Sequence, residues 1–270
     1  MRQASPEYPL PDFSLPDPVA HKGIAVQGLS KTFQDKPVLD ELDFTIDSGE
    51  TIVIIGRSGE GKSVLLKHIV RLLEPDQGRI WVDGEEITAL DKPRLFELRR
   101  RFGMLFQGAA LFDSMTISEN VGLGLKEHSK LSSAEIRQRS QECLGRVGLD
   151  DVEDKLPSAL SGGMKKRAGL ARAIVMEPEY ILYDEPTTGL DPITADAIND
   201  LIIKLQRELQ VTSIVVTHDM ASAFKIADRI AMLHRGKIVF RGTVAEVRET
   251  DNAMVQQFIE GSAQGPLSAF

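Results

Sequence analysis

The stretch Thr51-Ile52-Val53-Ile54-Ile55-Gly56-Arg57-Ser58-Gly59-Glu60-Gly61-Lys62-Ser63 decides the fold of this chain. Its beginning, Thr51 to Ile55, is a continuous apolar run, which indicates a strand buried on both faces. The part from Gly56 to Ser63 matches the pattern G-x-x-x-x-G-K-[ST]. After it, apolar residues recur at helical spacing: Leu65, Leu66, Ile69, Val70 and Leu73. A strand, a glycine-rich loop and a helix in this order predict a phosphate-binding loop.

Each residue type in this loop has a chemical reason to be there. Glycines let successive backbone N–H groups curl around phosphate oxygens, because no side chain intervenes. The helix that follows presents its positive N-terminal end to the same anion. Lys62 is expected to reach the β- and γ-phosphates of ATP, and the Ser63 hydroxyl to ligate Mg²⁺. The other ATP-binding residues expected here are Gly56, Arg57, Ser58, Gly59, Glu60, Gly61 and Val64.

A second half of the site lies downstream, where the apolar strand 180–183 ends in Asp184 and Glu185. In a parallel sheet that end faces the ligand crevice. Asp184 can then hold Mg²⁺, directly or through water, and Glu185 can polarise the attacking water. Alone, such an ending fits a solvated acidic turn equally well. Together with the phosphate loop it predicts ATP hydrolysis.

Strands and helices alternate along most of the chain. Ser132 and Glu135 form a capping-box pattern that opens a helix to about Val147, and Asp191 can cap a long helix with Pro192 in its first turn. Strand–helix alternation on both sides of a helical block predicts an α/β core with a mostly parallel sheet and a helical insertion. Strands are expected at 24–26, 42–46, 78–82, 180–183 and 213–217, a short helix at 93–101, and mostly helices from about 117 to 176.

Composition narrows the functional classes. The 270 residues include 32 Lys+Arg and 40 Asp+Glu, a formal net charge of −8, which argues against bulk attraction to nucleic acid or anionic lipid. The single cysteine, Cys143, forms no internal disulfide and fits a small buried core residue. No apolar run approaches the roughly 18 residues that span a bilayer. A cytoplasmic protein is predicted, with any membrane connection made through a partner.

At 160–164 the sequence Leu-Ser-Gly-Gly-Met resembles the LSGGQ signature of ABC-type ATPases, with Met164 in place of Gln. The other motifs of that family follow the expected order, at Phe33, Gln107, Asp191 and His218. The resemblance implies a P-loop NTPase fold of the RecA-like type, with an antiparallel β subdomain and an inserted helical subdomain. It divides the chain into a Pro-rich tail (1–20), an ABC ATPase domain (21–250, with the helical subdomain at about 108–176) and a C-terminal extension (251–270).

The resemblance also assigns roles. Phe33 would stack on adenine, Gln107 would touch Mg²⁺ or the attacking water, and His218 would contact the γ-phosphate. The signature residues Ser161, Gly162, Gly163 and Met164 would close over the ATP of a second subunit, and Asp191 would lie in the D-loop. A homodimer with two sandwiched ATP molecules is therefore implied. Taken singly, Phe33 would fit a core residue and Gln107 would fit a solvated loop residue. His218 alone would fit a surface or core histidine whose hydrogen bonds are satisfied.

Several stretches look like the Mla/Mce lipid-transport branch of the family: 105–116, 125–128, LSGGMKKRAGLARAI at 160–174, DEPTTGLDPIT at 184–194 and the end at 258–266. This closer resemblance implies an ATPase subunit at the cytoplasmic face of the inner membrane. It would energise separate permease subunits that move phospholipid or another hydrophobic molecule across the bacterial envelope. A small regulatory subunit and a substrate-binding MCE protein are further partners that it suggests.

Three alternatives differ in cargo or class. One is an importer ATPase for a small polar solute, and another is a soluble ABC protein of DNA repair or translation. The second lacks support, since no long coiled coil or second ATPase domain is visible. A phosphoryl-transferring kinase would leave the signature motif and His218 without a role.

Four other stretches carry expectations of their own. The basic runs 99–101 and 165–167 are expected to be solvated helix surface. Leu111, Phe112 and Met115 are expected either to contact a permease or to pack inside the helical subdomain. A helix at 253–259 is expected to pack its apolar side on the partner subunit, with docking on its own core as the alternative. The first twenty residues, with five prolines, are expected to be extended, as an inert tail or a strap.

Overall fold

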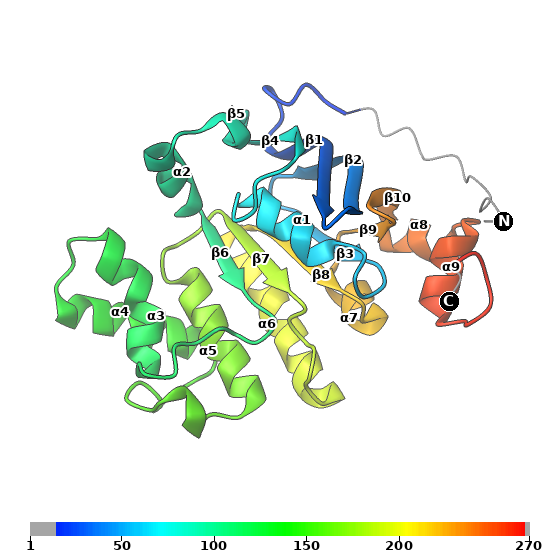
Figure 1. Ribbon diagram of the computed structural model, residues 1–270. Coiled ribbons are helices and arrows are strands. Elements are labelled where there is room, and N and C mark those ends of the chain that lie inside the picture. The colour runs from blue at the N-terminus through cyan, green and yellow to red at the C-terminus, as the bar shows by residue number, and fades with distance from the viewer. Residues whose placement is uncertain (1–14, 268–270) are drawn as a thin grey trace.

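The apolar run at 51–55 forms β3 (Thr51–Ile55), with all five residues buried. The computed structural model describes residues 15–267, and within them β3 lies inside a six-stranded sheet of order β10-β9-β3-β8-β7-β6 (Figure 1). Pairing is parallel except between β9 and β10, which form an antiparallel hairpin. The other strands are β6 (Phe102–Leu105), β7 (Tyr180–Asp184), β8 (Thr212–Thr217), β9 (Arg229–His234) and β10 (Lys237–Thr243).

Alternate residues of β3 enter two different cores. Val53 and Ile55 belong to one buried apolar cluster, and Ile52 and Ile54 belong to the other. Helices around the sheet contribute to both clusters, together with other strands of this sheet, as expected for a central strand of an α/β core. These helices are α1 (Lys62–Ile69), α2 (Lys92–Arg99), α6 (Pro192–Leu209), α7 (Met220–Ile226), α8 (Val244–Glu249) and α9 (Ala253–Glu260), with a 3₁₀ turn η1 (Ile87–Ala89).

A second, antiparallel sheet packs near α1 (Figure 1). Its strand order within the described residues is β2-β1-β4-β5, and Ile24 pairs with Ile46 on one side and Val82 on the other. The strands are β1 (Gly23–Phe33), β2 (Lys36–Asp47), β4 (Gln77–Val82) and β5 (Glu85–Glu86).

A block of helices is inserted between β6 and β7, and Figure 1 shows it projecting to one side of the main sheet. It contains α3 (Ile117–His128), α4 (Ser133–Arg146), η2 (Pro157–Ala159) and α5 (Gly162–Ile174). The capping box of Ser132 and Glu135 is present at the start of α4, and Asp191 caps α6 through the N–H groups of Ile193 and Thr194. The predicted fold class is confirmed.

The two sheets are tied together at Asp83. Its Oδ1 accepts from the Gly23 N–H (2.8 Å), and its Oδ2 accepts from the Tyr180 hydroxyl (2.8 Å) and from Arg101. Arg99 donates to the carbonyls of Val70 and Arg71 at the end of α1. The expectation that 99–101 is a solvated basic run is therefore wrong for Arg99 and Arg101, because guanidinium groups satisfy carboxylates and terminal helix carbonyls at this junction.

The two ends of the described chain differ from expectation. Residues 1–14 of the expected extended tail lie outside the described residues, but the N–H groups of Ala20 and His21 donate to Asp17 O, which makes a turn there. Val19 O lies so close to Gly84 that a Cβ at Gly84 would come within 2.4 Å of it. This segment therefore packs against the β4–β5 turn.

At the other end, α9 packs on its own chain. Val255 is fully buried and Met254 nearly so, both within the core cluster that contains Val239 and Val247. The interpretation that this apolar side lies on a partner subunit is wrong for these two residues, and the alternative of docking on the chain's own core is confirmed. Val239 of β10 and Val247 of α8, the two elements that directly precede α9 in the chain, belong to this cluster.

Gln257 fixes the residues that follow α9. Its Oε1 accepts from the Leu267 N–H (2.7 Å), and its Nε2 donates to Ser262 O (3.0 Å) and Leu267 O (3.3 Å). Gly265 lies over this side chain, where a Cβ would come within 2.4 Å of Oε1. The loop 261–267 is therefore closed onto the helix. Within residues 15–267, no helix has both the length and the apolar character needed to cross a membrane.

Candidate nucleotide site

The phosphate loop connects β3 to α1 at the centre of the main sheet. Gly56 and Gly61 have φ of 152° and 101°, and a Cβ at Gly56 would lie 2.4 Å from Leu233 O. At Gly61 a Cβ would lie 3.0 Å from Val38 O. Only glycine meets both the backbone angle and the space at these positions. The loop thus keeps its curled form with bare N–H groups.

Lys62 lies buried at the start of α1. Its Nζ donates to Gly56 O (2.7 Å) and Arg57 O (3.1 Å) and lies 3.7 Å from Glu185 Oε1. Burial lowers the pKa of Lys62, against the opposing effect of nearby carboxylates, chiefly that of Glu185. One ammonium group therefore lies between the phosphate loop and the acidic end of β7.

Two oxygen-bearing side chains meet beside the loop. The Ser63 hydroxyl donates to Asp184 Oδ1 at 2.6 Å, although 121 residues separate them. Hydroxyl and carboxylate oxygens are the ligands that Mg²⁺ prefers, so the pair fits that ion. Asp184 is nearly buried at the end of β7. The sequence prediction placed both residues in one metal site, and the structure brings them into contact.

Glu185 follows β7 in a left-handed conformation with φ of 51°. Its N–H donates to Val216 O (2.9 Å) on the neighbouring strand β8. Its Oε2 accepts from Thr188 Oγ1 (3.1 Å) and contacts His218 Nδ1 (2.9 Å). If the carboxylate accepts this bond, Nδ1 carries the proton and Nε2 is left as the outward-facing nitrogen. Hydrogen bonds to the main-chain N–H and to the side-chain Oε2 therefore hold Glu185 in place.

Glu60 anchors the other edge of the loop. Burial raises the pKa of its carboxyl, but hydrogen bonds from His234 and from the Arg235 N–H outweigh burial and hold that pKa below its usual range. The charged form is thus favoured, and the loop is fixed to the turn between β9 and β10.

The signature residues lie at the exposed N-terminus of α5. Ser161 caps the helix by accepting from the Met164 N–H (3.3 Å). Gly163 packs against α6, where a Cβ would come within 2.6 Å of Thr194 Cγ2, while at Gly162 the nearest atom would be 3.6 Å away. Asp191, the predicted D-loop residue, lies beside them as the N-cap of α6. Bare N–H groups of a helix start and the D-loop thus share one exposed surface.

Two other predicted site residues are exposed. Gln107 follows β6, and its main-chain carbonyl accepts from Lys166 Nζ at 2.5 Å. Phe33 ends β1 with 40% of its surface exposed, and Lys31 Nζ lies 5.5 Å from the ring centroid. A half-exposed aromatic ring at a strand end is available for stacking. Arg57, Ser58, Gly59 and Val64 complete the loop and the first turn of α1.

Lys166 is the residue that sequence reasoning missed. It is only 5% exposed, and its Nζ donates to the carbonyls of Gln107 and Glu185 (3.1 Å). The expectation of a solvated basic run at 165–167 is wrong for it. A signal was present, because Leu170, Ala173 and Ile174 follow at i+4, i+7 and i+8, which places Lys166 on the apolar face of α5.

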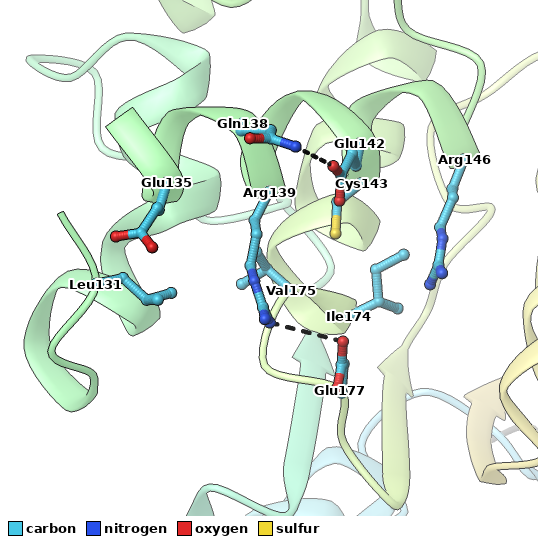
Figure 2. Close-up of a pocket in the computed structure, with 10 residues that line it drawn as sticks. All are labelled: Leu131, Glu135, Gln138, Arg139, Glu142, Cys143, Arg146, Ile174, Val175 and Glu177. Carbon is cyan, nitrogen blue, oxygen red and sulfur yellow. Dashed lines mark hydrogen bonds and ion pairs between the residues drawn. The ribbon is translucent and has the colours of Figure 1, made fainter. Parts of the chain in front are cut away.

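Two cavities differ in their relation to this site. One, of about 590 Å³, lies along α4 and the end of α5 and is drawn in Figure 2, where Arg139 and Glu177 form an ion pair across it. Its lining includes none of the predicted nucleotide residues, and burial raises the pKa of its Cys143 thiol to about 11. A second, of about 380 Å³, separates Arg57, Ser58 and His218 from the loop 261–267.

Comparison with known proteins defines the class. The ABC transporter family model matches residues 39–188. The chain is 41% identical over 244 residues to the probable ribonucleotide transport ATP-binding protein mkl of Mycobacterium tuberculosis, covering 90% of this chain and 68% of that protein. It is 40% identical over 244 residues to the intermembrane phospholipid transport system ATP-binding protein MlaF of Haemophilus influenzae, covering 90% and 92%.

A solved structure supports the same class. The dimeric post-hydrolysis state of the ATP-binding cassette MJ0796, bound to ADP and Pi, matches with a TM-score of 0.76 and 33% identity over 82% of this chain and 98% of that one. The chain belongs to the ABC transporter family. More particularly, it is an ATP-binding subunit with ATPase activity, similar to the MlaF and mkl proteins.

Proposed function

We propose that this chain energises a separate permease that moves phospholipid or another hydrophobic molecule across the bacterial envelope. Two copies would bind two ATP molecules between them, at the cytoplasmic face of the inner membrane. A small regulatory subunit and a substrate-binding MCE protein would complete the assembly. The similarity to an intermembrane phospholipid transport protein supports the choice of cargo.

One observation supports the proposed ATP hydrolysis: the side chains around the phosphate loop and the end of β7 contact one another. The contacts join Lys62 to Glu185, Ser63 to Asp184, and Glu185 to His218. Lys62 would hold the β- and γ-phosphates as a point charge. Glu185 would orient the attacking water and accept its proton, and His218 would face the γ-phosphate through Nε2. Ser63, Asp184 and Gln107 would hold Mg²⁺, which supplies charge neutralisation on the phosphates when bound.

A second copy would bring its signature residues to the phosphate loop of the first. Ser161, Gly162, Gly163 and Met164 start α5 beside Asp191, whereas the phosphate loop precedes α1. The helix start offers N–H groups to an anion. In the proposed homodimer it closes over the ATP held by the other subunit, and Phe33 of each subunit stacks on the adenine that its own loop holds.

A second candidate cargo has one observation in its favour. The mkl relative is described as a probable ribonucleotide transport protein, which suggests a polar solute. One experiment distinguishes the two proposed cargoes: the tagged chain is purified from membranes with its permease and reconstituted in liposomes. ATPase stimulation by phospholipid in the membrane, with co-purified lipid identified by mass spectrometry, supports the lipid assignment. Stimulation by added ribonucleotide, with no lipid retained, would support the polar one.

A further inference from the structure

Helix α5 carries a buried ammonium group to the ends of two strands. Lys166 Nζ donates to Gln107 O (2.5 Å) and to Glu185 O (3.1 Å). Gln107 follows β6 and Glu185 follows β7, and these strands are parallel neighbours in the main sheet. A single side chain of the inserted helical block therefore ties together the main chains of two residues at the nucleotide site.

Three of the four carbonyls that Lys166 and Arg172 hold belong to residues with left-handed backbone. Glu185 has φ of 51°, and Ala109 and Ala110 have φ of 61° and 49°. Arg172, also on α5, donates to Ala109 O (2.6 Å) and Ala110 O (2.7 Å). Left-handed conformations at residues other than glycine cost energy and persist where surrounding contacts hold them. Two cations of one helix supply such contacts on both strand ends.

Burying an ammonium group is costly unless it is paired and hydrogen-bonded. Lys166 meets this condition at its present position, where two carbonyls accept its protons and the carboxylates of Asp184 and Glu185 lie near. A shift of α5 along its axis would stretch both bonds. The contact therefore behaves as a stiff link rather than a sliding one.

The same helix begins with the signature residues. Gly162 and Lys166 are four residues apart, one helical turn, so a displacement of the start of α5 is passed directly to the Lys166 side chain. We propose that Lys166 is a positioning residue: when the partner subunit's nucleotide engages the start of α5, Lys166 sets the main chains of Gln107 and Glu185 in its own subunit. This inference rests on the proposed composite sites, and it couples the two sites of the dimer.

The test compares Lys166→Met with the neighbouring control Lys165→Met, whose side chain donates to neither carbonyl, and with Lys166→Arg, which keeps the charge and donors. ATPase rate, ATP dissociation constant, Hill coefficient for ATP and melting temperature are measured on the full chain with Mg²⁺. In Lys166→Met the kcat should fall more than fivefold, with the dissociation constant within twofold and a Hill coefficient near 1. Lys166→Arg should recover most of the kcat, and Lys165→Met should match the wild type.

A kcat within fivefold of the wild type, or an equal loss in Lys165→Met, would overturn the inference. If Lys166→Met does not fold, Lys166→Gln takes its place under the same criteria, because its side chain is one atom shorter and lacks the ammonium charge. A loss of ATP binding in step with kcat would indicate a structural role and count against positioning. Failure of the composite-site assignment itself shows separately, in the mixing of Gly162→Asp and Lys62→Ala subunits described below. If mixing those subunits restores activity while Lys166→Met has normal turnover, only the positioning role of Lys166 is contradicted.

Discussion

The Ser63 hydroxyl donates to Asp184 Oδ1 at 2.6 Å, which joins the first turn of α1 to the end of β7. The two oxygens are brought together by parallel strands β3 and β7, with β8 between them. Because both groups are natural Mg²⁺ ligands, Ser63→Ala should raise the Mg²⁺ concentration for half-maximal ATPase activity roughly tenfold. Titrating Mg²⁺ at saturating ATP checks this. Ser129→Ala, in the helical block, serves as control, and an unchanged Mg²⁺ requirement would remove Ser63 from the metal site.

Glu185→Gln should bind ATP with near wild-type affinity and hydrolyse it about 100-fold more slowly, because the amide cannot accept the proton of the attacking water. The variant keeps an oxygen that can accept from His218 and Thr188, so the local fold should persist. Single-turnover hydrolysis and gel filtration with ATP provide the measurements, and a stable ATP-bound dimer is expected. Near-normal turnover would move the role of base to another residue.

Gly162→Asp should lower ATPase activity more than tenfold, because it places a like charge against the γ-phosphate of the opposite subunit. Gly162→Ala is the control, since its Cβ would make ordinary contact with Leu190 at 3.6 Å. Position 163 is less suitable, because any Cβ there meets Thr194 within 2.6 Å.

The same variant tests whether the site is shared between subunits. Homodimers of Gly162→Asp and of Lys62→Ala should each have low ATPase activity, but mixing them should raise it. Each heterodimer then contains one site with an intact loop from one chain and an intact signature from the other. No recovery on mixing would contradict the composite site.

Substitution by glutamate should have different effects at Phe112 and at Leu111. Phe112 is 51% exposed on a backbone held by the buried side chain of Asn120, whereas Leu111 is half-buried against the core. Phe112→Glu should remain folded and bind ATP but lose co-purification with the permease. Leu111→Glu should lower the melting temperature instead, because it buries a charge. Retained permease binding by Phe112→Glu would argue against this surface as the contact.

Asp83→Asn should destabilise the chain by about 1–3 kcal/mol at pH 7, because it weakens the junction of the two sheets. Burial raises the pKa of the Asp83 carboxyl, but hydrogen bonds from Tyr180, Gly23 and Arg101 outweigh burial and hold it below its usual range. The stabilisation is therefore present above the unfolded pKa of about 4 and is lost as pH falls through the lower folded value. Urea unfolding at pH 7 and pH 3 should show the difference between variant and wild type shrinking in acid.

The sequence predicts the strand, loop and helix around 51–63 because each step there follows from local patterning. The end of β7 was also foreseeable, since an apolar run closed by Asp184 and Glu185 has one natural place in a parallel sheet. These predictions needed only neighbouring residues and one rule of topology.

Arg101 could not be placed in that way, and for Lys166 the spacing along α5 indicates burial but not the groups that satisfy its charge. Their charges suggest solvent, and what buries them is the position of carbonyls and carboxylates supplied by strands far away in the chain. The apolar side of α9 predicts the helix from sequence. The same pattern indicates only that this side is buried, and not which surface buries it. Whether a partner or the chain itself covers Val255 depends on where β10 and α8 end.

The inert cysteine has a practical consequence. Cys143 is the chain's single cysteine, and a thiol with a pKa of about 11 is almost wholly protonated and unreactive near neutral pH. A new cysteine at exposed Ser262, across the small cavity from Ser58 and His218, would be the one site to take a maleimide dye. The wild-type background thus allows labelling beside the phosphate loop without first removing a native thiol.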